Sequence, residues 1–296
     1  LRGATAPGGN LEEDRVGRPP MSAIDRVFEK CRLEKRAAFI PYLTAGDPDL
    51  KRSAELLEAL VAGGADIIEL GVPFSDPIAD GPVIQRAAVR ALEAGTNLSH
   101  ILELVAAQRD RLGVPIVLFS YFNPIHARGV EAFADQARAS GVDGLLCLDL
   151  PPEEAGSELI PAMRDKGIDT IFLLAPTSTK ARVKLVAEAS SGFVYYVSRT
   201  GVTGVKADLA DELLRDAKRL RRKVRLPLAV GFGISTPEQV EAVSKVADGV
   251  VVGSALVRIV EESSSAPNLA RLIEAEVRRL SSPLHAGRRR KTADED

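Results

Sequence analysis

The strongest constraint on the fold of this chain is a regular alternation of short apolar runs with longer amphipathic stretches over residues 38–252. The runs consist almost entirely of apolar residues, the pattern of strands in a parallel sheet that is covered on both faces. We therefore predict eight strands, at Ala38–Leu43, Asp66–Leu70, Pro115–Ser120, Gly144–Leu148, Thr170–Leu174, Phe193–Val197, Leu228–Val230 and Gly249–Val252.

The stretches between these runs carry helical periodicity, and glycines that end helices follow several of them. Eight strand–helix units in about 250 residues build a single (β/α)8 TIM barrel. An open, doubly wound sheet is the main alternative, but no G-x-G-x-x-G follows the first run, which counts against its dinucleotide-binding form. The predicted helices include Ser53–Ala62, Ile101–Arg111, Val130–Ser140, Glu153–Lys166, Lys180–Ser190, Leu209–Arg222 and Pro237–Val246.

The barrel pattern lies within residues 21–282, which we predict to be one catalytic domain. Residues 1–20 are rich in glycine and proline and contain no apolar segment of a signal peptide, so they are predicted to be a disordered tail or a non-native extension before Met21. Residues 283–296 contain Arg288–Lys291 and then an acidic end, which is typical of a solvated, flexible tail.

The composition excludes several classes of protein. The 39 basic and 41 acidic residues give a net charge of −2, which argues against a nucleic-acid partner. No apolar run approaches the roughly 18 residues of a membrane helix, so no membrane association is expected. Cys31 and Cys147 form no C-x-x-C, and the three histidines lack the spacing of metal ligands. We expect a cytoplasmic protein without a metal, whose acid–base chemistry uses carboxylates.

The active site of a TIM barrel lies at the carboxyl ends of the strands. Glu69 interrupts the second apolar run, and a buried carboxylate is costly unless it is paired or protonated, so a function would explain it. The alternative is a glutamate whose oxygens are satisfied by backbone amides or a nearby arginine. The following loop adds Asp76 and Asp80 between prolines. Two carboxylates can divide proton transfer and charge stabilisation, which makes Glu69 and Asp80 the candidate pair.

Phosphate binding is the second signal. TIM barrels frequently bind phosphate at the loops after strands seven and eight, where this chain has Gly231–Ser235 and Gly253–Ala255. Glycine lets backbone amides approach an oxyanion, and a helix N-terminus favours negative charge. Ser198–Gly204, after strand six, has the composition of a loop that closes over a ligand. Tyr195, inside strand six, either points into the site or fills a barrel layer, and core packing is the stronger interpretation from sequence alone.

These segments resemble the alpha subunit of tryptophan synthase, an indole-3-glycerol-phosphate lyase family, in both order and spacing. The resemblance covers about residues 22–280, and the long motif that begins at Glu69 is its most specific part. The matching segments are Phe39–Pro48, Glu69–Pro77, Ala79–Pro82, Ser198–Gly204, Gly231–Ser235 and Gly253–Ala255.

The resemblance implies retro-aldol cleavage of indole-3-glycerol phosphate to indole and glyceraldehyde 3-phosphate. It assigns proton shuttling to Glu69, stabilisation of the cationic indole ring to Asp80, and an active-site role to Tyr195. Thr203 would hold Asp80 when its loop closes. The implied phosphate site consists of the backbone at Gly204, Phe232, Gly233, Gly253 and Ser254.

The resemblance also implies a partner, a beta subunit that forms an alpha-beta-beta-alpha complex and carries pyridoxal phosphate, while the alpha chain needs no cofactor. A free-standing lyase without that partner is the nearest alternative. Another phosphate-binding barrel, such as indole-glycerol-phosphate synthase or phosphoribosylanthranilate isomerase, is disfavoured by the Glu69–Asp80 loop. A catalytically silent scaffold is disfavoured because both carboxylates and both phosphate loops are present.

Overall fold

The computed structural model describes residues 21–197, 207–231 and 233–291, with side chains for 21–197, 213–231 and 233–285. In these residues, nine strands form one sheet in which all pairs are parallel. The strands are β1 (Ala38–Thr44), β2 (Ile68–Gly71), β3 (Ile116–Ser120), β4 (Gly144–Cys147), β5 (Asp169–Ile171), β6 (Leu173–Leu174), β7 (Val194–Val197), β8 (Leu228–Gly231) and β9 (Gly249–Val252).

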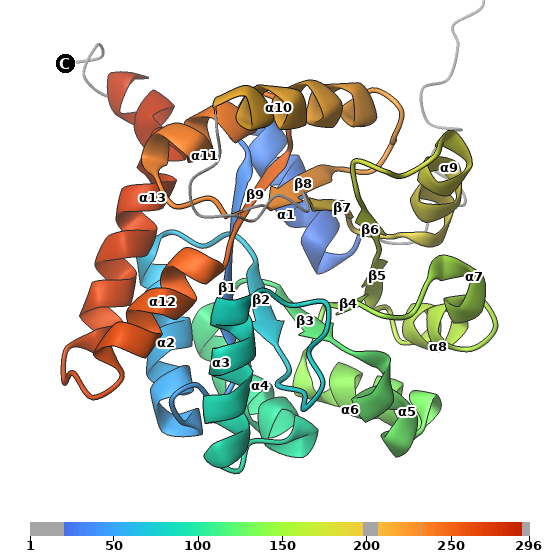
Figure 1. Ribbon diagram of the computed structural model, residues 1–296, viewed down its shortest axis with the longest axis vertical. Helices are drawn as coiled ribbons and strands as arrows, with labels where there is room; N and C mark the ends of the chain where they lie inside the picture. The colour runs from blue at the N-terminus through green and yellow to red at the C-terminus, as the bar shows by residue number, and fades with distance from the viewer. Residues whose placement is uncertain (1–20, 198–206, 232, 292–296) are drawn as a thin grey trace, which may run out of the picture.

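The order of the strands is β5-β4-β3-β2-β1-β9-β8-β7-β6. β5 pairs with β4 and β6 pairs with β7, and only Phe172 separates β5 from β6 in the chain. The two short strands therefore take the place of the single fifth strand that we predicted at Thr170–Leu174. Counted this way, eight strand positions close the ring, and the predicted (β/α)8 barrel is confirmed (Figure 1).

Helices surround the strands in Figure 1. The prediction at Glu153–Lys166 is wrong in one respect, because this stretch forms two short helices with Gly156 between them. The helices of the described residues are α1 (Ala23–Leu33), α2 (Leu50–Gly63), α3 (Pro82–Glu93), α4 (Leu98–Leu112), α5 (Phe122–Arg128), α6 (Val130–Ser140), α7 (Pro152–Ala155), α8 (Leu159–Asp165), α9 (Lys180–Ala189), α10 (Ala207–Arg221), α11 (Pro237–Ser244), α12 (Ser254–Ser263) and α13 (Leu269–Lys291).

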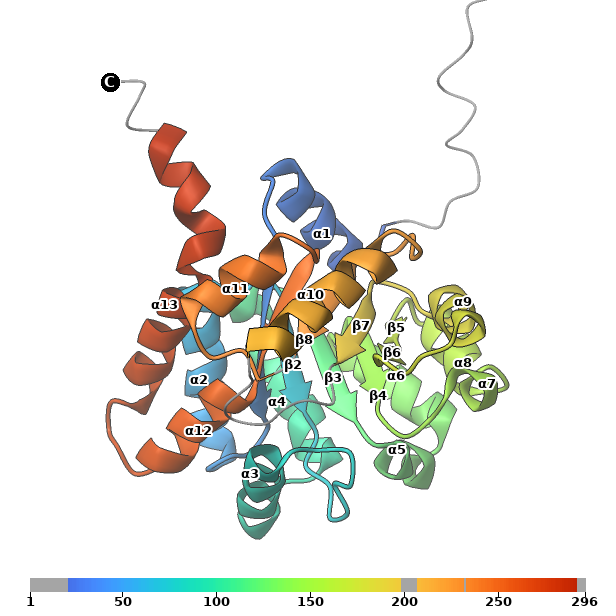
Figure 2. The ribbon, with the colours of Figure 1, turned by 45° about the horizontal axis from the view of Figure 1, so that its top comes forward.

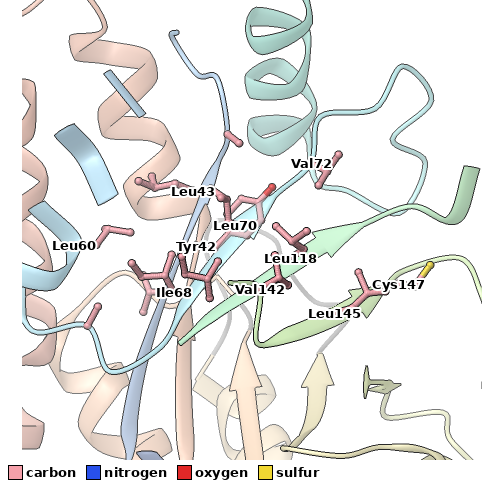
Figure 3. Close-up of a cluster of buried hydrophobic side chains, with 14 of the residues drawn as sticks. Tyr42, Leu43, Leu60, Ile68, Leu70, Val72, Leu118, Val142, Leu145 and Cys147 are labelled. Carbon is pink, nitrogen blue, oxygen red and sulfur yellow. The ribbon is translucent and has the colours of Figure 1, made fainter. Parts of the chain in front are cut away.

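Strand alternation divides the buried residues into two clusters. Ala38 and Ile40 belong to a cluster inside the barrel, whereas Phe39 and Leu43 belong to the larger cluster between strands and helices. This is the period of two expected for side chains on opposite faces of a sheet. Part of the larger cluster is drawn in Figure 3, with side chains from β1 to β4. The alternation is what directs a residue such as Glu69 inward.

One end of the barrel is closed by α1, which precedes the first strand and was not predicted. Its N-cap Ser22 accepts a hydrogen bond from the amide of Asp25, and the Asp25 side chain accepts one in return from Ser22, which forms a capping box. The buried face of α1 joins the interior cluster, where the rings of Phe28 and Phe193 lie 5.6 Å apart. Figure 2 shows α1 at one end of the barrel and α3, which follows the carboxyl end of β2, at the opposite end. The candidate site is therefore expected at the end where α3 lies.

The last helix, α13, passes the predicted domain boundary at residue 282 and continues to Lys291. Its apolar residues keep helical spacing through Val277, Leu280 and Leu284, all of them buried. The Ser281 hydroxyl donates to the carbonyl oxygen of Gly63 at the end of α2, at 3.2 Å. Residues 283–291 are thus part of a helix, and Leu284 within it still packs on the barrel.

Candidate active site

Glu69 lies on β2 at the end of the barrel opposite α1. Ile67, two residues earlier, belongs to the interior cluster, so the alternation of β2 directs Glu69 into the barrel as well. Its side chain is 1% exposed, and its Oε1 has no hydrogen-bond partner among the described residues. Burial raises the pKa of Glu69 to about 8, and the charge of Asp80 adds to the effect. At neutral pH this side chain is a buried carboxylic acid.

Asp80 lies in the loop between β2 and α3 and is half-buried. Its Oδ2 accepts a hydrogen bond of 3.0 Å from the hydroxyl of Tyr121. Its backbone is held by Gln85, whose side-chain amide donates to the carbonyl oxygens of Pro77 and Asp80. Burial raises the pKa of Asp80 to about 6, although the hydrogen bond from Tyr121 opposes this shift. Asp80 is therefore mainly ionised at neutral pH.

The two carboxyl groups thus have different protonation states near pH 7, because Glu69 is the more deeply buried and is opposed by the negative charge of Asp80. Carboxyl groups whose surroundings separate their pKa values in this way can act as an acid and an anion in the same site. The alternative considered from sequence was a Glu69 satisfied by amides or an arginine. Within the described residues, no amide or arginine donates a hydrogen bond to Oε1 of Glu69.

Tyr195 on β7 belongs to the interior cluster, and its hydroxyl lies beside Gly231 at the carboxyl end of β8. Its hydroxyl lies 2.4 Å from the point that a Cβ at Gly231 would occupy, so a larger residue there would displace the Tyr195 side chain. Burial raises the pKa of Tyr195 well above its usual value, with a further contribution from the charge of Glu69. Tyr195 is therefore both a packing residue of the barrel interior and a neighbour of Glu69. The two interpretations from the sequence, a residue of the site and a residue of the core, are thus compatible.

The predicted phosphate loops follow β8 and β9, which are neighbours in the sheet. Gly253 is the N-cap of α12 and makes no side-chain cap, and Ser254 is the first residue of that helix. Gly233 has a φ of +48°, a left-handed conformation that favours glycine, and a Cβ there would meet nothing within 4 Å. The backbone at these positions suits an anion at a helix N-terminus. Thr203, Gly204 and Phe232 lie outside the described residues.

Two tyrosines that sequence reasoning missed also belong to the site. Tyr42 pairs in register with Glu69, is buried, and its hydroxyl lies 3.2 Å from Oγ1 of Thr44. Its ring contacts the point where a Cβ at Gly253 would lie, at 3.4 Å, so it connects the carboxylate side to the phosphate side. Tyr121 directly follows β3. Its position at a strand end was the available signal, by the same rule that identified Glu69.

Asp149, which follows β4, also contributes to this end of the barrel. Its Oδ1 accepts a hydrogen bond of 2.7 Å from the amide of Phe122 and one of 3.6 Å from Sγ of Cys147. The carboxylate therefore anchors the start of α5, immediately after Tyr121. Its contacts assign it a role in holding the loop rather than in proton transfer.

The architecture and the residues at the carboxyl ends of its strands define an enzyme of the (β/α)8-barrel class. A family model described as tryptophan synthase alpha chain matches residues 28–284. The chain belongs to this family, and it is a lyase of tryptophan biosynthesis. The family resemblance stated from the sequence motifs is confirmed.

Curated relatives named tryptophan synthase alpha chain are similar along most of their length. The chain is 51% identical to the protein of Geotalea daltonii over 82% of this chain and 92% of the relative. It is 50% identical to that of Solibacter usitatus over 88% and 97%. Within the described residues, no helix is long and apolar enough to cross a membrane.

Solved structures agree with this assignment. The tryptophan synthase subunit alpha of Legionella pneumophila superposes with a TM-score of 0.84 at 36% identity, over 90% of this chain and 99% of that one. A chain of Mycobacterium tuberculosis tryptophan synthase superposes with a TM-score of 0.80 at 40% identity, over 89% and 98%.

Proposed function

We propose that this chain cleaves indole-3-glycerol phosphate to indole and glyceraldehyde 3-phosphate with Glu69 and Asp80 as its acid–base pair. The observation that carries the proposal is the buried Glu69 carboxyl, whose Oε1 has no hydrogen-bond partner in the part of the chain that the structure describes and whose pKa is raised to about 8. A protonated acid held inside the barrel can donate to carbon, a transfer that water performs poorly at neutral pH.

The reaction needs two proton transfers and no change of oxidation state. Glu69 donates its proton to C3 of the indole ring, which becomes a cationic indolenine. Asp80, ionised, accepts a hydrogen bond from the ring N–H and stabilises the positive charge. The Glu69 carboxylate then takes the proton from the hydroxyl adjacent to C3. The carbon–carbon bond breaks, its electrons return to the ring, and the aldehyde forms while Glu69 regains its proton.

The other candidate residues position the substrate. Tyr195 lies beside Glu69 over Gly231 and would confine the reacting carbon. The amides at Gly233, Gly253 and Ser254 would hold the phosphate, with those of Gly204 and Phe232 completing the site. Thr203 would fix Asp80 when the loop after β7 closes.

The same proposal includes a beta subunit as partner, in an alpha-beta-beta-alpha complex in the cytoplasm. Pyridoxal phosphate then belongs to the beta subunit, and this chain acts with neither a metal nor an organic cofactor. The contact surface would include Pro73–Pro77, which lies next to Ile78, an apolar side chain that is 87% exposed. Transfer of indole between subunits would prevent its loss, since indole is small and apolar. A free-standing lyase remains the alternative.

The test is indole release from indole-3-glycerol phosphate by the purified chain, alone and with a beta subunit. We expect Glu69→Gln and Asp80→Asn each to lower kcat by about 10² to 10⁴-fold, the usual contribution of a positioned proton-transfer group. Glu188→Gln, at an exposed position on α9, is the matched control and should change nothing. Near wild-type turnover of either site variant would refute its role, and turnover that no beta subunit raises would favour the free-standing lyase.

A further inference from the structure

Tyr121 has a hydrogen-bonding arrangement that the proposed mechanism does not use. It follows β3 directly, and its side chain is 3% exposed. The hydroxyl accepts a hydrogen bond of 2.9 Å from the amide of Ala79 and donates one of 3.0 Å to Oδ2 of Asp80. One phenol oxygen thus fixes two successive residues of a loop that lies about 40 positions earlier in the chain.

The ring of Tyr121 is itself held in place by the same loop. It packs on the ring of Phe74, with centroids 5.1 Å apart and planes tilted by 31°. Phe74 stands near the start of the loop and Asp80 near its end, so Tyr121 contacts both ends. A phenol held at its ring and at its hydroxyl can place a carboxylate with little freedom.

The direction of these hydrogen bonds favours one charge state of Asp80. A phenol has a single proton. The oxygen accepts from the amide of Ala79 and the proton is donated to Oδ2 of Asp80, which is the acceptor of this bond. An ionised carboxylate accepts more strongly than a protonated one, and such charge-assisted bonds are about twice as strong as neutral ones.

We propose that Tyr121 is a positioning residue that holds Asp80 in place and keeps it ionised for stabilisation of the cationic ring. This inference rests on the function proposed above for Asp80. The described ionisable groups that face the same space are Glu69 from β2 and Tyr42 from β1, while Asp149 after β4 acts on Tyr121. The hydroxyl of Tyr121 donates a side-chain hydrogen bond to Asp80, and this bond lowers the pKa that burial raises.

The first test is Tyr121→Phe, which keeps the ring on Phe74 and removes both hydrogen bonds of the hydroxyl. The acidic limb of the kcat profile should move up by roughly one pH unit, the size expected for loss of one hydrogen bond to a charged group. KM for the substrate should change by less than about threefold, because Tyr121 acts on the charge-stabilising group rather than on the phosphate. Tyr196→Phe, a buried tyrosine on the outward face of β7, is the matched control and should move neither quantity.

A second test separates positioning from a general structural role. In an Asp80→Asn background, Tyr121→Phe should cause little further loss of kcat, because the group through which it acts has gone. An equal loss in both backgrounds would overturn the proposal.

The third measurement does not need catalysis. Carboxyl-carbon NMR of the ligand-free protein should show the titration of Asp80 at higher pH in Tyr121→Phe than in the wild type. An unshifted titration would refute the inference about Tyr121. A shifted titration in a protein that fails to cleave indole-3-glycerol phosphate would instead refute the proposed function and leave the positioning intact.

Discussion

A buried acid such as Glu69 should weaken the fold at high pH, and Glu69→Gln should remove that weakness. The pKa of Glu69 rises from 4.5, its ordinary value, to about 8 in the folded protein. Below the lower value both the folded and the unfolded chain bind the proton, so there is no penalty. Above it the unfolded chain ionises freely while the folded chain resists. The penalty grows as pH rises and becomes constant above the higher value.

The size of the effect follows from these two values. Each pH unit between them is worth about 1.4 kcal/mol of unfolding free energy. Between about pH 5 and about pH 9, the ionisation of Glu69 therefore lowers the free energy of unfolding of the wild-type protein by roughly 4 kcal/mol. The glutamine variant does not have this loss. A buried amide without partners has its own cost, but that cost is the same at both pH values and cancels in the comparison.

The assay is thermal or urea unfolding of both proteins at the two pH values, with Glu188→Gln as the exposed control. Relative to the wild type, the Tm of Glu69→Gln should gain about 10 °C on going from the lower to the higher pH, as expected for a domain of this size. If the wild type and Glu69→Gln lose equal stability between the two conditions, Glu69 is not a strained, protonated acid. The proposed source of its proton would then be wrong.

Further predictions concern the proposed site. The kcat profile should be bell-shaped, rising near pH 6 as Asp80 ionises and falling near pH 8 as Glu69 loses its proton, and a profile without the upper limb would contradict the role of Glu69. Gly233→Leu should severely weaken phosphorylated ligands and affect free indole much less, because a side chain there blocks backbone approach; equal weakening would remove this loop from the phosphate site. Ser254→Ala should cost only about 1 kcal/mol of binding, because the hydroxyl is lost but the backbone amide that would hold the phosphate is kept. Since the chain has no tryptophan, bound indole fluorescence reports both titrations directly.

The barrel was predictable because its determinants are local. Every predicted strand corresponds to an observed one, apart from the fifth, which is interrupted at Phe172. The alternation that places Ile67 and Glu69 on one face needs only the strand and its period. The charge run at Arg288–Lys291 predicted a solvated tail, whereas α13 continues to Lys291. The burial of Leu280 and Leu284 against the barrel is a tertiary effect that the charges do not show.

The arrangement around Asp80 was not predictable in the same way. The sequence shows that an aspartate stands in a proline-rich loop, and this singles out the residue without orienting its carboxylate. The orientation comes from Tyr121, which is 41 positions away and reaches Asp80 only because β2 and β3 pair in register from Ile68 to Gly71. A hydrogen bond across this distance leaves no periodic trace in the sequence.

The two carboxylates are therefore specified by different means, and this difference suits their proposed chemistry. Glu69 is fixed by a strand inside a close-packed barrel, where burial, with a further contribution from the charge of Asp80, keeps it protonated. Asp80 must stay ionised although it is half-buried, and burial acts against ionisation. This effect of burial is offset by a hydrogen-bond donor, the hydroxyl of Tyr121, which follows another strand. A site with one neutral acid and one anion thus requires both the local pattern of β2 and the tertiary contact from Tyr121. A substitution that leaves Glu69 and Asp80 unchanged can therefore still remove the difference in protonation between them.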